Sequence, residues 1–146
     1  MTDKVIKLKA KDADDVLVIS AVLQDAIAPV SDMTFDTDAK NFIMVVQRLC
    51  RPTKDGAGLA RICCAVNVRG VDHTQLHGID LTQQGRILDL LAVMPDGRSV
   101  TFIFAGDAKI RLRLGDWSMI VEDFGEAWPA QCNPCHDGAS SVVKVS

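Results

Sequence analysis

Two cysteines and a histidine near the C-terminal end form the sharpest chemical pattern in the chain. Cys132, Cys135 and His136 follow the spacing C-x-x-C-H, at which two thiols attach a haem and the histidine ligates its iron. Haem is attached to such motifs outside the cytoplasm, whereas residues 1–9 alternate charged and apolar side chains, unlike an export signal. The character of residues 1–9 therefore argues against haem attachment at this motif. Chance cysteines in a loose tail are the simpler interpretation.

The same pair also fits a zinc site or a redox dithiol. Two thiolates at this spacing can share one zinc ion, with His136, His73 or His77 completing the tetrahedral site. His73 and His77 converge on a metal only from a helix, because in a strand they lie about 13 Å apart. A redox pair works best at a helix N-terminus, but the surrounding proline and glycine predict a loop. We expect no cofactor, with zinc at Cys132, Cys135 and His136 as the alternative.

A row of cations is the second candidate site. Lys109, Arg111 and Arg113 fall on one face of a predicted strand, and Arg61 and Arg69 of a neighbouring strand can join them. Such a face can bind an anion or nucleic acid, although it is more often simply solvated. Aromatic residues make up 5% of the chain and none interleaves with these cations, so nucleic-acid bases would lack a stacking platform.

The remaining polar residues give no sign of a catalytic centre. Neither a nucleophile with its base nor a pair of carboxylates is placed on rigid elements. The acidic clusters at 12–15 and 122–126 fit a helix N-terminus and the polar face of a helix. The segment 56–58 has neither the length nor the lysine of a phosphate-binding loop. The sequence favours a protein without catalytic activity.

Composition excludes several classes of protein. The 146 residues suit one domain, and 48% hydrophobic residues suffice for a core. A formal net charge of -3 opposes a protein that coats nucleic acid or an anionic membrane. Asp89 interrupts one of the longest apolar stretches, and none approaches the roughly 18 apolar residues of a membrane span. Adjacent Cys63 and Cys64 do not suit a disulfide framework, so we expect a cytoplasmic protein.

One helix is predicted near the N-terminus, after a short strand over residues 5–9. Asp12 has the position of a helix cap, apolar residues then recur at spacings of three and four, and Pro29 ends the element. Apolar side chains cover most of the circumference of this helix. We expect it to be covered on two sides, by the sheet and by either a loop or a second subunit, and we favour the homodimer.

Alternation of apolar and polar residues dominates the middle of the chain and predicts strands. We expect them over 33–35, 41–49, 61–69, 87–94, 100–104 and 109–114, with a further strand after Gly70. Residues 51–59 are typical of an exposed loop, and the sequence Pro-Asp-Gly-Arg at 95–98 predicts a tight turn.

A second helix is predicted at the end of the domain. Its stripe comprises Trp117, Ile120, Val121, Phe124 and Trp128. We therefore predict an α+β fold with an N-terminal helix, about seven mostly antiparallel strands in a curved sheet or pleckstrin-homology-like roll, and a closing C-terminal amphipathic helix. Residues 1–129 form the single domain, and 130–146 form a partly disordered tail.

Three segments carry a resemblance to a known family. They are 8–27, 102–112 and 122–128, which include the sequences LKAKDADD, FIFAG and EDFGEAW. In these segments the chain resembles an alphaproteobacterial domain-of-unknown-function family, number 2948, over roughly residues 5–136. The resemblance implies a small cytoplasmic bacterial protein and brings no catalytic residues. The C-x-x-C-H pattern is not among its motifs, so a role for that pattern would not be shared by the family.

The sequence as a whole favours a non-catalytic protein-interaction module whose partner is another protein or a second copy of the chain. A small metal-binding or redox protein that uses Cys132 and Cys135 is the first alternative. Anion or nucleic-acid binding through the basic sheet face is the second, and the lack of aromatic residues argues against nucleic acid.

Overall fold

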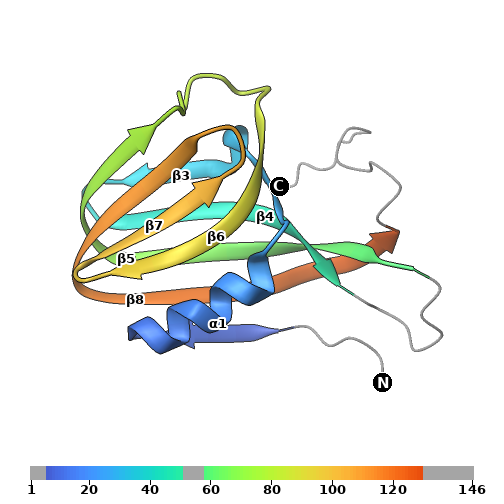
Figure 1. Cartoon of the computed structure of the whole chain (residues 1–146), viewed down its shortest axis with the longest axis horizontal. Helices are drawn as coiled ribbons and strands as arrows, with labels where there is room; N and C mark the ends of the chain where they lie inside the picture. The colour runs from blue at the N-terminus through green and yellow to red at the C-terminus, as the bar shows by residue number, and fades with distance from the viewer. Residues whose placement is uncertain (1–5, 51–57, 130–146) are drawn as a thin grey trace.

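The structure is a computed structural model that describes residues 6–50 and 58–129, and its main feature is a β-barrel (Figure 1). The elements are β1 (Lys7–Ala10), α1 (Ala13–Leu23), β2 (Ile27–Pro29), the 3-10 turn η1 (Val30–Asp32), β3 (Met33–Asp36), β4 (Asn41–Cys50), β5 (Ala60–His77), β6 (Ile87–Asp96), β7 (Ser99–Phe104) and β8 (Ala108–Pro129).

Antiparallel pairing closes the sheet on itself. The strand order is β1-β8-β5-β4-β2-β6-β7, and β7 also pairs with β8, so that six strands from β8 round to β7 complete a ring. β1 and β3 lie outside this ring, paired with β8 and β4 respectively. β8 therefore contacts β1, β5 and β7, and it is the strand on which closure depends.

Strict alternation along the strands builds the core inside the barrel. Phe42, Phe102 and Phe104 are among its largest fully buried side chains, and the rings of Phe42 and Phe102 lie 5.9 Å apart between centroids. Ile110 and Leu112 of β8 are buried beside them, while their neighbours in sequence face solvent. Period two thus places the polar residues of β8 on the outer surface.

Helix α1 begins where the sequence predicts and ends earlier. The side chain of Asp12 accepts a hydrogen bond from the Asp15 amide at 2.9 Å, which caps the helix, and α1 packs mainly against β6. It stops at Leu23, and residues near Pro29 form β2 instead. Leu17 and Val18 are 46% and 56% exposed, so the described chain covers the helix on one side only. The homodimer stays a prediction.

The predicted C-terminal helix is wrong. Residues 117–128 belong to β8, in which Met119 and Val121 are buried two positions apart, as in a strand, while Phe124 of the supposed helical stripe is 44% exposed. Backbone pairing with both β5 and β1 holds this segment extended. The predicted α+β curved sheet or pleckstrin-homology-like roll with a closing helix is therefore replaced by a mostly β fold with a closed barrel.

The predicted strands in the middle of the chain agree with the structure, except that two of them are joined into one. The strands expected at 61–69 and after Gly70 are one long strand, β5, with register shifts on either side of Val71. Gly70 has φ of 85°, and a Cβ there would clash with the Asp116 carbonyl. A glycine at this bulge therefore lets β5 continue past the point where β4 ends.

Two predicted segments lie outside the described residues, namely 51–57 of the loop and the tail 130–146. Within the described part of the chain, no helix combines the length and the apolar character that crossing a membrane requires.

Candidate anion-binding site

Three adjacent strands present polar side chains in rows on the outside of the barrel. One cross-strand row runs from His73 on β5 through Arg113 on β8 to Ser99 on β7, and the next pairs Gln75 with Arg111. Residues directly opposite one another in an antiparallel sheet share a face. The pairing thus brings together side chains that are far apart in the sequence.

A tight turn between β6 and β7 completes the site. Gly97 has φ of 60°, a left-handed conformation that glycine adopts without strain, and the turn places Asp96 and Arg98 beside the two rows. The Leu114 amide donates a 2.7 Å hydrogen bond to the Arg98 carbonyl, which anchors the turn to β8.

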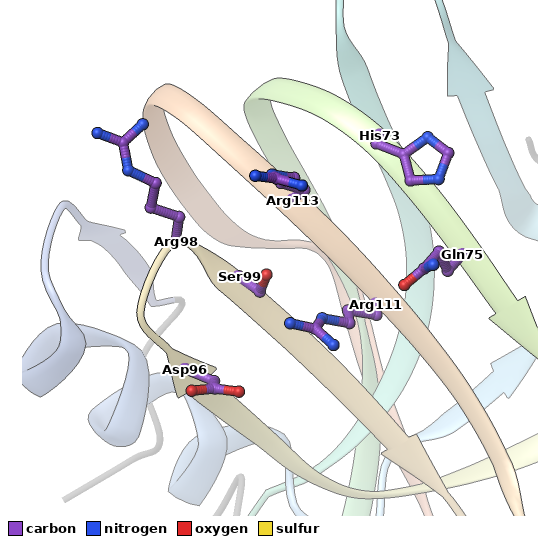
Figure 2. Close-up of a pocket in the computed structure, with 7 residues that line it drawn as sticks. All are labelled: His73, Gln75, Asp96, Arg98, Ser99, Arg111 and Arg113. Atoms are coloured by element: carbon purple, nitrogen blue, oxygen red, sulfur yellow. The ribbon is translucent and has the colours of Figure 1, made fainter.

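Together these side chains line an open cleft of about 410 Å³ (Figure 2). Its lining residues are His73, Gln75, Asp96, Arg98, Ser99, Arg111 and Arg113. In Figure 2 the guanidinium group of Arg111 extends toward Ser99 and Asp96. Ser99 is only 6% exposed, so the most enclosed part of the cleft presents a small polar residue.

Charge in the cleft is strongly unbalanced. Among the described residues, no ion pair or side-chain hydrogen bond engages Arg98, Arg111 or Arg113. Asp96 is the one carboxylate among the lining residues. Other surface charges do have partners, such as Lys40 with Asp72 at 3.3 Å. Three guanidinium groups without partners therefore border the same cleft, where they generate a positive potential.

A second polar cluster lies buried between β4, β5 and β8. Arg48 donates from Nε to Asp123 Oδ1 at 2.8 Å and from an Nη atom to Oδ2 at 2.6 Å, and the Ile6 amide donates to Oδ2 at 3.0 Å. Burial alone would raise the pKa of Asp123, but the hydrogen bonds from Arg48 and Ile6 outweigh it and lower that pKa. The carboxylate is therefore ionised and fully engaged.

Cys64 belongs to this buried cluster. Burial raises the pKa of the Cys64 thiol far above its usual value, and the negative charge of Asp123 and hydrogen bonding to its carboxylate add to this shift. A thiol of this kind is a poor nucleophile. Because the Cys64 thiol is unreactive and the Asp123 carboxylate is bound to Arg48, the role of this cluster is to hold β4, β5 and β8 together.

Comparison with protein-family models assigns the chain. The model for the family described as "Protein of unknown function (DUF2948)" matches residues 6–136. The chain belongs to the DUF2948 family. This confirms the resemblance carried by the three sequence segments. No curated protein and no solved structure matches the chain.

The cleft of this DUF2948 protein contains two of the five predicted cations. Arg111 and Arg113 line it, whereas Lys109 lies one row further along, opposite His77. Arg61 donates to the Gln47 carbonyl at 2.8 Å, well away from the cleft. Arg69 pairs across the sheet with Asn41 and Ser118 and does not line the cleft.

Sequence reasoning did not assign the other five lining residues to this site, and Arg98 and His73 are the two that carry or can carry positive charge. The turn at 106–107 fixes the β7–β8 register, and counting back along the hairpin from it places Arg98 beside Leu114, so a local signal for Arg98 existed. His73 reaches the site through the long-range pairing of β5 with β8, whose register shifts near Val71 no local pattern reveals.

The predicted metal ligands of this DUF2948 protein remain a prediction. Cys132, Cys135 and His136 lie outside the described residues. His73 and His77 both lie in β5, an extended strand in which a four-residue separation spans about 13 Å, so they are too far apart to share an ion. Over 6–50 and 58–129, no group of three or more His, Cys, Asp or Glu side chains is arranged to hold a metal.

Proposed function

We propose that this protein is a non-catalytic binding module that takes up an anionic group of its partner in the cleft between β5, β8 and β7. One observation carries the proposal: Arg98, Arg111 and Arg113 border one cleft and have no ion-pair partner among the described residues. Guanidinium groups bind carboxylates and phosphates through paired, charge-assisted hydrogen bonds. An incoming anion would supply the partner that the fold does not.

The other polar groups in the cleft also support anion binding. Ser99 and Gln75 can each donate a hydrogen bond to an anion that the arginines attract. Asp96 adds a negative charge to the lining, which favours a ligand with localised anionic groups over one with a continuous run of charge.

Catalysis and nucleic-acid binding have less support. Asp96 lies opposite Ser99 across the β6–β7 hairpin, but among the described residues no hydrogen bond connects Ser99 with Asp96 or His73, so no base is in position to activate the hydroxyl. The lining residues include no phenylalanine, tyrosine or tryptophan on which a base could stack. The buried, protonated thiol of Cys64 fits a protein of a reducing cytoplasm, which we include in the proposal.

A titration with inorganic phosphate and pyrophosphate tests the cleft. We expect chemical-shift changes at the amides of Ser99, Arg111 and Arg113 in the spectrum of the ¹⁵N-labelled protein, and weaker binding as salt rises. The double variant Arg111→Gln/Arg113→Gln should bind at least about tenfold more weakly, because two charge-assisted contacts are lost.

Arg69→Gln is the control for charge outside the cleft, since it removes one positive charge from an exposed position of β5, as each single variant Arg111→Gln or Arg113→Gln does within the cleft. It should leave binding within about twofold, as expected for a screened surface charge. Absence of shifts at the cleft amides, or an equal loss of binding in the control, would disprove the proposal.

A further inference from the structure

β5 has an open edge next to the cleft. Its first part, Ala60 to Arg69, pairs with β4 on one edge and β8 on the other, but beyond Gly70 only the β8 pairing continues, as far as His77. Figure 1 shows this part of β5, in lighter green, reaching beyond β4. Within the described chain, the other edge of residues 73–77 therefore has no neighbouring strand.

The backbone groups on that edge can be assigned from the ladder. Leu114 donates its amide to Arg98 across the β7 side, and the direction alternates along a strand, so Arg113 and Arg111 turn their amides and carbonyls toward β5. Their partners there are His73 and Gln75. The residues between and beyond them, Thr74 and Leu76, consequently point their backbone groups toward the open edge.

The side chains of Thr74 and Leu76 alternate with those of the cleft residues and so lie on the opposite face of β5. The Thr74 hydroxyl is buried and has no hydrogen-bond partner among the described residues, and Leu76 is 39% exposed. Neither lysine nor proline occurs between Asp72 and His77, although exposed edges commonly carry such residues, which hinder the pairing of another strand. This edge retains its capacity to pair.

We propose that the open edge of β5 binds an extended acidic segment of a partner protein by strand addition. Main-chain hydrogen bonds to Thr74 and Leu76 would hold the segment. Acidic side chains on its outer face would lie next to His73 and Gln75, which form the β5 side of the cleft. The inference rests on the proposed function, because the cleft supplies the attraction for the acidic groups.

Reach and alternation define the segment further. The added strand would lie about 10 Å from β8, two strand spacings away, a gap that an arginine and a glutamate side chain span together. Alternate residues of the segment would face the cleft, and the residue between them would lie opposite Thr74, on the face that also carries Leu76. The favoured sequence is therefore acidic, apolar, acidic.

Other occupants fit the edge less well. A nucleic-acid backbone offers no regular array of donors and acceptors to match those of Thr74 and Leu76. Pairing of two copies through this edge would bring like cations of two clefts together, because a two-fold contact places identical surfaces opposite each other. An acidic peptide satisfies both the edge and the charge.

The test uses a capped, fluorescent heptapeptide of alternating glutamate and valine, titrated into the full chain and followed by fluorescence anisotropy. We expect saturable binding and slowed amide exchange at Thr74 and Leu76. A peptide with glutamine in place of glutamate should bind at least about tenfold more weakly. N-methylation of the edge-facing amides of the peptide should have a similar effect with no change to the protein.

Thr74→Pro provides the complementary variant, because it removes an amide that faces away from β8 and leaves the β5–β8 ladder intact. It should abolish peptide binding and retain phosphate binding. Phosphate binding without peptide binding, peptide binding insensitive to N-methylation, or tighter binding of a single-stranded oligonucleotide would overturn strand addition while the anion site stands. Loss of both phosphate and peptide binding in the unmodified protein would overturn both proposals.

Discussion

The two arginine sites of this barrel differ in burial and in whether the arginine has a carboxylate partner. Arg48 is buried and meets Asp123 through two hydrogen bonds, whereas Arg111 and Arg113 are exposed and meet no carboxylate in the described chain. Asp123 and the two cleft arginines lie on the same strand, β8, about ten residues apart. The contrast teaches that an arginine supplied with its own counterion maintains the fold, and one left without it is available to a ligand.

Breaking the buried pair should have the largest effect. Asp123→Asn leaves Arg48 buried without its counterion, which should lower the free energy of unfolding by about 3–5 kcal/mol. Urea denaturation followed by tryptophan fluorescence measures the change. Glu122→Gln, at the exposed neighbouring position, should stay within about 0.5 kcal/mol. A loss below about 1 kcal/mol for Asp123→Asn would mean that the pair does not maintain the barrel.

Acid should weaken the same pair. The folded-state pKa of Asp123 lies below its ordinary value of 3.8, so its contribution to stability is present above that value and is lost as pH falls through the folded-state pKa. Unfolding free energies between pH 5 and pH 2 should decline more steeply for the wild type than for Asp123→Asn. Parallel pH profiles for the two proteins would contradict this assignment.

The buried thiol should be chemically silent in the folded protein. Cys64 is fully buried and its pKa is raised, so alkylation by iodoacetamide at pH 8 should be at least about tenfold slower than in urea. Mass spectrometry of the digested protein identifies the modified site. Equal rates in the native and unfolded states would show that the cluster opens readily.

Removing the cleft arginines should have the smallest effect on stability. Arg111→Gln/Arg113→Gln breaks no ion pair within the described chain and relieves repulsion between like charges, so the unfolding free energy should stay the same or rise by up to about 0.5 kcal/mol. Differential scanning calorimetry is suitable for so small a change. A clear loss of stability would make these arginines structural, and the contrast with Arg48 would disappear.

Local patterns predicted many of the strands, because apolar and polar residues alternate along them. β4, β6 and β7 were found in this way. The segment around Trp117 to Trp128 satisfied both a helical and an extended period, and only pairing with β5 and β1 decides between them. Arg48 and Asp123 lie 75 positions apart, and no local pattern connects them. Of the seven lining residues of the cleft, alternation along β8 indicated Arg111 and Arg113, whereas His73 reaches the cleft through a bulged, long-range register.

The long strand β8 also governs how the barrel can form. It pairs with β1 near the start of the chain, with β5 and with β7, so the ring cannot close until residues up to about 120 have left the ribosome. Contacts of such high sequence separation favour slow folding, in roughly milliseconds to seconds. Until then β1 and the part of β5 beyond Gly70 have no partner strand. Chaperones would bind the chain during this interval.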